Sequence, residues 1–146
     1  MKEIIEKINL LSRKEQDQLL ELLFVQRQQY ETINLIKKTV CVYLGISFRI
    51  VISKTRKENV VLARHLILYY LFKHTTNLSL TEIAAIVNLK THADVIHACR
   101  KIEKMLLIKN KFTAPVIAIT QRLNFALNEK MYFVIDENRV KWRDYY

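Results

Sequence analysis

Glycine and proline are nearly absent from this sequence: its 146 residues include one glycine, Gly45, and one proline, Pro115. Folds built from β-sheets rely on glycine for turns and for close approach of backbones, so this scarcity favours helices. P-loops and dinucleotide-binding fingerprints each need several glycines within a short window. The sequence therefore excludes both motifs, and we expect no nucleotide partner, no cofactor and no enzymatic activity.

Cysteine is also scarce, and long apolar runs are missing. Cys41 and Cys99 lie in apolar stretches, and neither belongs to a Cys-x-x-Cys pair or to a cluster with the spacing of metal ligands. We interpret both as small buried hydrophobes and expect no metal site. No apolar run reaches the roughly 18 residues that a membrane span needs, and charged residues interrupt the first positions. We therefore expect no membrane partner and a cytoplasmic protein.

Positive charge is concentrated in the middle of the sequence. The formal net charge is +10, and residues 53–111 hold eleven Lys and Arg against four Asp and Glu. Residues 1–40, 41–52 and 112–146 each contribute a net charge of only +1. A basic segment of this kind usually meets a polyanion, although a generally basic surface is the simpler interpretation of charge alone.

Residues 1–37 predict two amphipathic helices. The apolar residues of the first helix share one face: Ile4, Ile5, Ile8 and Leu11. Ser12 and Glu15 have the spacing of a capping box and open a second helix, which continues as a long connecting helix or forms a hairpin with the first. Such a segment packs on its own domain, on a second copy of the chain or on another protein, and the sequence leaves these alternatives open.

Residues 38–127 predict an all-α domain. A short helix over residues 40–44 ends at Gly45, Ser47 caps a further turn, and a basic loop over residues 53–58 leads to an apolar helix over residues 59–73. Ser79 and Glu82 form a second capping-box pattern and open a short helix over residues 80–87. After a turn at residues 88–90, Thr91 begins a helix that reaches about residue 106, and a last helix spans residues 113–127. The pair over residues 79–106 is typical of a helix-turn-helix.

The tail, residues 128–146, has a different composition. Aromatic and β-branched residues at 132–135 and at 139–142 flank a polar triplet, which predicts a small β-hairpin. An isolated hairpin is marginal in water, so this one is expected to pack on the helices or on a partner. The predicted organisation is therefore amphipathic helices (1–37), a helix-turn-helix domain (38–127) and a tail (128–146).

The predicted recognition helix carries candidate DNA contacts. Its early residues would face base edges, where His92 can donate to guanine N7 and the Ala93 methyl can touch a thymine methyl. Later basic residues suit the phosphate flanks: Arg100, Lys101 and Lys104. Asp94 has two interpretations, a capping partner of Thr91 or a reader of a cytosine amino group. The histidines equally fit the surface of an ordinary helical domain.

Three segments resemble the C-terminal DNA-binding domain of the bacterial replication initiator DnaA. They are residues 56–65 (RKENVVLARH), 78–84 (LSLTEIA) and 92–103 (HADVIHACRKIE), and the run VIHACRKIE is the most specific. Residues 42–47 (VYLGIS) are similar to the opening helix of that domain. The resemblance covers residues 38–110, about half of the chain, and does not extend to the nucleotide-binding domain of the initiator.

The resemblance implies an all-helical, Trp-repressor-like fold that docks its helix-turn-helix in the major groove of a DnaA box. Arg56 holds the place of a loop arginine that enters the minor groove. An Arg-Gln pair contacts phosphates in the family, and here Arg64 is followed by His65, a departure. The family motif Asp-His-Thr-Thr aligns with residues 91–94, where only His92 matches. The candidate base-reading residues are Arg56, Lys90, Thr91, His92, Ala93 and Asp94, and the candidate phosphate contacts are Lys54, Lys57, Arg64, His65, Leu80, Thr81, His97, Arg100 and Lys101.

Two functions follow as hypotheses. The first is sequence-specific binding of double-stranded DNA, without ATPase activity, in an accessory or regulatory role in replication or transcription at the bacterial nucleoid. The alternative is a protein-interaction module whose base-reading side chains have drifted. In either case residues 1–37 or the tail offer a surface for a second copy or another protein.

Overall fold

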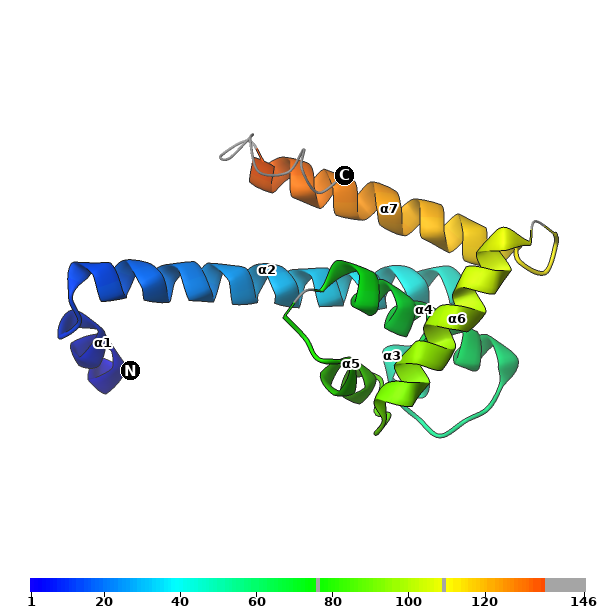
Figure 1. Ribbon diagram of the computed structural model, residues 1–146, viewed down its shortest axis with the longest axis horizontal. Helices are drawn as coiled ribbons and strands as arrows, with labels where there is room; N and C mark the ends of the chain where they lie inside the picture. The colour runs from blue at the N-terminus through cyan, green and yellow to red at the C-terminus, as the bar shows by residue number, and fades with distance from the viewer. Residues whose placement is uncertain (76, 109, 136–146) are drawn as a thin grey trace. The chain divides into compact units, whose positions relative to one another are not determined.

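The computed structural model describes residues 1–75, 77–108 and 110–135, and every regular element within these ranges is a helix (Figure 1). The predicted all-α class is therefore confirmed. The chain divides into two compact units, Met1–Glu31 and a second unit that begins at Thr32. The boundary falls inside a long helix, α2 (Arg13–Leu44).

Unit 1, residues Met1–Glu31, contains α1 (Lys2–Asn9) and the first part of α2. The predicted capping box is present: the Glu15 N–H donates to Ser12 Oγ at 3.2 Å, and the Ser12 N–H donates to the Glu15 carboxylate at 3.3 Å. Gln16 Nε2 donates to the carbonyl oxygen of Ile8 at 2.9 Å and so joins the end of α1 to the start of α2. No residue before Ile36 is buried, so unit 1 has no core of its own.

The helix predicted at residues 40–44 is not separate but is the last part of α2. Apolar residues continue at helical spacing through Ile33, Ile36 and Val40, and no glycine or proline interrupts them before Gly45. Gly45 ends α2 as predicted, with φ at +65°. Its N–H donates to the Val42 carbonyl and the Ile46 N–H donates to the Cys41 carbonyl, which is the Schellman pattern.

The core of unit 2 is built around α4 (Glu58–His74), which packs against α3 (Phe48–Val51), α5 (Leu80–Ile86) and α6 (His92–Leu107). A helix that is apolar on all sides belongs in an interior, and α4 accordingly buries residues around its whole circumference: Val60, Ala63, Leu66, Ile67, Leu68, Tyr69, Tyr70 and Leu71. Of the two cysteines, Cys41 is buried as predicted, whereas Cys99 is half-buried against this core. Ser47 precedes α3 at the predicted position, without a side-chain cap bond.

The last helix, α7 (Ala114–Ile135), packs against α6, and the Arg122 guanidinium lies over the Tyr43 ring at 4.8 Å. Asn110 Oδ1 accepts from the N–H groups of Phe112 and Thr113 just before this helix begins. The prediction of a first hairpin strand at residues 132–135 is wrong, because the backbone there continues α7. Continuation of an existing helix outweighs the weak β-propensity of these residues. Its second strand, 139–142, lies outside the described residues. Among the described helices, none combines the length and the apolar content that crossing a bilayer requires.

Candidate nucleic-acid interface

The helix-turn-helix predicted over residues 79–106 is formed by α5, a tight turn and α6. Ser79 caps α5, with its Oγ accepting from the Glu82 N–H at 3.1 Å. The turn closes α5 with a second Schellman pattern, in which the Leu89 N–H donates to the Ala84 carbonyl at 2.9 Å and the Asn88 N–H donates to the Ala85 carbonyl at 3.0 Å. Asn88 has φ at +62°, in the left-handed region that asparagine tolerates better than most residues.

The first turn of α6 presents the residues predicted to face base edges. Thr91 is the N-cap residue, and His92 and Ala93 follow it with exposed side chains. The Thr91 hydroxyl donates to the Asp94 carboxylate at 2.8 Å. Thr91 makes no side-chain cap bond to the backbone of α6, so the expected capping box is not formed. Asp94 is instead bonded to the Thr91 side chain in the first turn, where a negative charge favours the helix dipole.

The two faces of α6 have different tasks. Val95, Ala98 and Ile102 are fully buried in the core of unit 2 and fix the rotation of the helix about its axis. The opposite face is exposed and carries a histidine and three basic residues in addition to the first turn: His97, Arg100, Lys101 and Lys104. Burial of one face therefore determines which side chains α6 offers to a partner.

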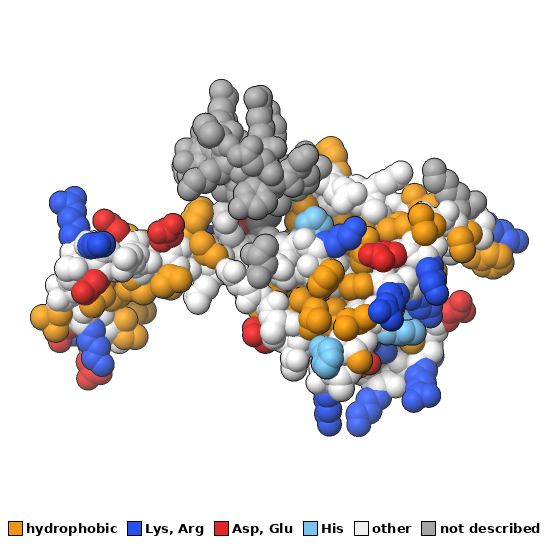
Figure 2. All heavy atoms as spheres, viewed as in Figure 1, with side chains coloured by type: hydrophobic (Ala, Val, Ile, Leu, Met, Phe, Trp, Pro, Cys, Tyr) orange, Lys and Arg blue, Asp and Glu red, His pale blue; other side chains and the backbone are white. Residues whose placement is uncertain are grey.

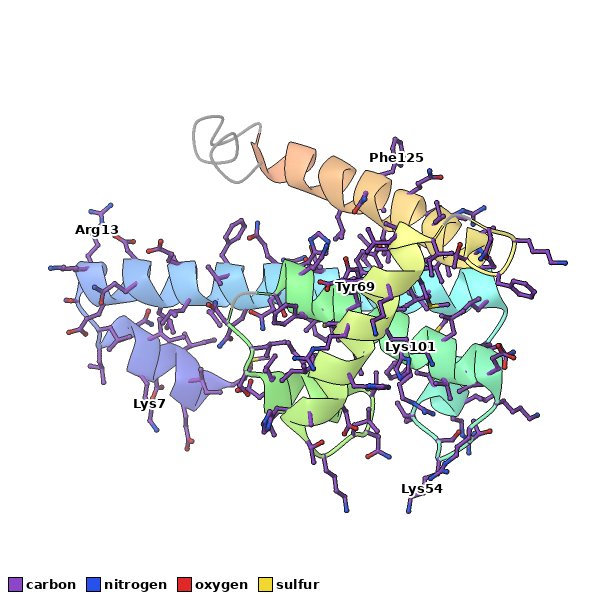
Figure 3. The ribbon with its side chains drawn as sticks, turned by 45° about the vertical axis from the view of Figure 1, so that its right-hand side comes forward. Lys7, Arg13, Lys54, Tyr69, Lys101 and Phe125 are labelled. Atoms are coloured by element: carbon purple, nitrogen blue, oxygen red, sulfur yellow. The ribbon has the colours of Figure 1, made fainter. Side chains whose placement is uncertain are left out.

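A basic loop, residues 53–57, connects α3 to α4 and carries exposed Lys54, Arg56 and Lys57. Figure 3 shows Lys54 extending away from the body of unit 2, and in both ribbon views this loop and the start of α6 lie on the same side of the unit (Figures 1 and 3). Thr55 shapes the loop locally, because its Oγ1 accepts from the Lys57 N–H at 3.4 Å.

His65 and His97 pack edge to face behind these basic residues, with ring centroids 5.7 Å apart. The pKa of His65 is lowered to about 4, mainly by burial and then by the positive charges of Lys101, His97 and Arg64, whereas Asp94 opposes the shift. His65 is therefore neutral at pH 7 and adds no positive charge to this surface.

Within the described part of unit 2, no Lys or Arg side chain forms an ion pair with a carboxylate. In the described ranges, the ion pair between a basic and an acidic side chain is Arg27–Glu31 at 3.4 Å, which belongs to unit 1. Figure 2 shows Lys and Arg side chains gathered on the part of unit 2 that holds α6 and the basic loop. Within those same ranges, no group of His, Cys, Asp and Glu side chains is arranged to hold a metal ion.

The structure brings most of the candidate residues to exposed positions on the loop and on α5 and α6: Lys54, Arg56, Lys57, Thr81, Lys90, Thr91, His92, Ala93, His97, Arg100 and Lys101. Leu80 differs, because its half-buried side chain packs against the core and leaves only its backbone for a phosphate contact. Arg64 and His65 are half-buried on α4. Asn88 is not among the predicted site residues, and its place in the turn is the only feature of the sequence that singles it out.

The sequence of the chain was compared with those of known proteins. Residues 33–102 match the family described as the bacterial dnaA protein helix-turn-helix. The chromosomal replication initiator protein DnaA of Thermodesulfovibrio yellowstonii is 44% identical over 73 residues, which cover 50% of this chain and 16% of the relative. The protein of the same name from Flavobacterium psychrophilum is 32% identical over 102 residues, covering 69% of this chain and 21% of the relative.

A third initiator, from Bacteroides thetaiotaomicron, is 35% identical over 92 residues, covering 63% of this chain and 19% of the relative. The chain thus spans about a fifth of the length of these relatives. The matched segment contains the basic loop, the buried helix α4, α5 and α6 as far as Ile102. Residues 33–102 therefore form a DNA-binding helix-turn-helix domain of the bacterial DnaA family.

Proposed function

We propose that unit 2 binds double-stranded DNA sequence-specifically, with α6 in the major groove and Arg56 in the adjacent minor groove of a site related to the DnaA box. The observation that carries the proposal is the orientation of α6. Its buried face leaves His92 and Ala93 exposed at the end of the helix that enters the groove in this motif. Exposed Lys and Arg residues on the loop and along α6 supply the phosphate contacts.

The proposed role is accessory or regulatory, in replication or transcription at the bacterial nucleoid, and without ATP hydrolysis. The single glycine of the chain supports the last part, because a P-loop needs several. Such a protein would occupy initiator-like sites without itself driving ATP-dependent melting. An ATP hydrolysis assay on the purified chain tests this part directly.

Fluorescence anisotropy against a DnaA-box duplex and a scrambled duplex, each titrated with salt, tests the binding mode. Neutralising about five phosphates would give a slope of log K against log[salt] near −4 to −5. We expect a preference for the box. Equal binding to both duplexes would redirect the search to another target by site selection, and no binding at low salt would favour the interaction module.

Two alanine variants separate base reading from charge. His92→Ala should reduce the discrimination between the two duplexes by about 1–3 kcal/mol. Lys101→Ala, its matched control on the same helix, should weaken binding to both duplexes equally and reduce the salt slope by about one. An unchanged preference in the His92 variant would remove this residue from the base-reading set.

We further propose that residues 1–37 form an interaction surface, with a second copy of the chain as the favoured occupant. Unit 1 leaves large apolar side chains exposed: Ile4, Ile5, Leu10, Leu20, Leu22, Leu23 and Phe24. A segment this short rarely folds alone without a partner surface to cover such residues. Part of the tail lies outside the described residues, and its proposed role as a partner surface rests on its composition alone.

A further inference from the structure

Arg64 makes three hydrogen bonds to the backbone that leads into the basic loop. Its Nε donates to the Val51 carbonyl at 3.0 Å, and its Nη2 donates to the carbonyls of Ser53 at 2.9 Å and of Thr55 at 3.2 Å. A guanidinium holds five N–H donors in a rigid planar fork, so one side chain fixes several carbonyls at once. Lysine, with a single charged nitrogen on a flexible stem, does not reproduce this geometry.

Asn88 reaches the same stretch from the helix-turn-helix. Its Nδ2 donates to the Ile52 carbonyl at 3.1 Å, across 36 positions of sequence. The residue lies in the turn between α5 and α6 with φ at +62°, and the turn itself ends α5. The turn of the helix-turn-helix is therefore bonded to the backbone at which the loop begins.

Together the two side chains bind four carbonyls within residues 51–55: those of Val51, Ile52, Ser53 and Thr55. Arg64 approaches from α4 and Asn88 from the turn before α6, so the loop is held from two elements. The next residues along the chain, Arg56 and Lys57, are exposed. Their position relative to α6 thus depends on bonds made by residues that are not themselves among the exposed cations.

We propose that Arg64 and Asn88 are positioning residues that hold the basic loop to the helix-turn-helix, so that Arg56 and α6 meet DNA as one preorganised surface. The proposal rests on the duplex binding proposed above. It gives Arg64 a task beyond the phosphate contact that the family resemblance implies, and it gives Asn88 a role in binding although this residue carries no charge. Preorganisation lowers the entropy that the loop would lose on binding.

Limited trypsin digestion of the full chain without DNA tests the holding of the loop, because the loop contains three trypsin sites, at Lys54, Arg56 and Lys57. Arg64→Lys keeps the charge and the number of trypsin sites. Asn88→Gly removes the side-chain hydrogen bond but places at position 88 a residue that adopts positive φ without strain. Asn88→Gly loses one hydrogen bond and should raise the rate of loop cleavage about fivefold, whereas Arg64→Lys loses up to three and should raise it about tenfold or more. Arg100→Lys, an exposed arginine of α6, is the control and should leave that rate unchanged. Circular dichroism verifies that each variant remains folded.

A double-mutant cycle tests the coupling to DNA. Asn88→Gly should weaken binding to the preferred duplex severalfold although it removes no charge, and it should add little to Arg56→Ala, because both changes remove the same loop contact. Unchanged loop cleavage in Arg64→Lys and Asn88→Gly would overturn the proposal. Full additivity of Asn88→Gly with Arg56→Ala would overturn the coupling. If the variants are cleaved faster but the native chain binds neither duplex, the proposed function is overturned, whereas the role of Arg64 and Asn88 in holding the loop is retained.

Discussion

At the scale of single residues, His65 shows how the fold controls the charge of one side chain. Its ordinary pKa of 6.5 falls to about 4 because it is partly buried and because Lys101, His97 and Arg64 repel a proton there. Between these two pH values the unfolded chain binds a proton that the folded chain does not. The free energy of unfolding therefore decreases as the pH falls through this window. Above about pH 6.5 His65 is neutral in both states and causes no loss of stability.

Replacing His65 with glutamine, the residue that the family has at this place, should remove this pH dependence. We expect His65→Gln to match the native chain in urea unfolding at pH 7 and to exceed it in stability at pH 5. The pKa of His74 is also lowered by burial, and its effect is common to both proteins, so it cancels in the comparison. An identical loss of stability in both proteins between pH 7 and pH 5 would contradict the assignment.

The candidate site residues differ in how far sequence could place them. The exposed positions of Lys54 and Arg56 follow from a polar, basic loop, and those of His92 and Ala93 follow from the periodicity of α6. The bond from Asn88 to the Ile52 carbonyl joins residues 36 positions apart, and only the packed fold creates it. The three carbonyl bonds of Arg64 arise in the same way. Local pattern therefore predicts exposure well and tertiary hydrogen bonds poorly.

At the scale of elements, helix starts were predictable because their chemistry is local. Ser12–Glu15 and Ser79–Glu82 form their capping bonds within three residues of sequence. Helix ends were predictable where a residue enforces them, as Gly45 does at the end of α2. The continuity of α2 through residues 40–44 and of α7 through residues 132–135 was missed, because neither depends on a local signal.

Gly45 is the residue whose conformation ends α2, and Gly45→Ala should destabilise unit 2 by roughly 1–2 kcal/mol. A Cβ at this position meets no atom within 4 Å, so the cost comes from the positive φ alone and not from a clash. Gly45→Asn is the matched control and should cost less, since asparagine tolerates the left-handed region better. Urea unfolding measures both variants. Equal stability of Gly45→Ala and the native chain would mean that α2 ends for another reason.

At the scale of the whole molecule, charge and apolar surface are divided between different parts of the chain. Residues 1–31 hold five Lys and Arg against six Asp and Glu, so the net positive charge lies entirely beyond them. Every residue of the buried core cluster in the described ranges follows Thr32, the first of them being Ile36. A nearly neutral segment with exposed apolar side chains suits contact with a copy of itself, because like-charge repulsion is small there.

Deleting residues 1–27 should therefore separate self-association from DNA binding. This deletion retains Gln28, Glu31 and Thr32, whose side chains or backbone take part in interactions with other residues. It also leaves the buried core cluster intact. We expect sedimentation equilibrium to show a dimer for the full chain and a monomer for the shortened chain, which should still unfold cooperatively. Leu20→Glu combined with Leu23→Glu should give the same monomer without shortening the chain, because it places charge among the exposed apolar residues. Both forms should bind a single duplex site with the same salt slope, since the proposed phosphate contacts all lie in unit 2. A full chain that sediments as a monomer would exclude the second copy as occupant and leave another protein as the partner of this surface.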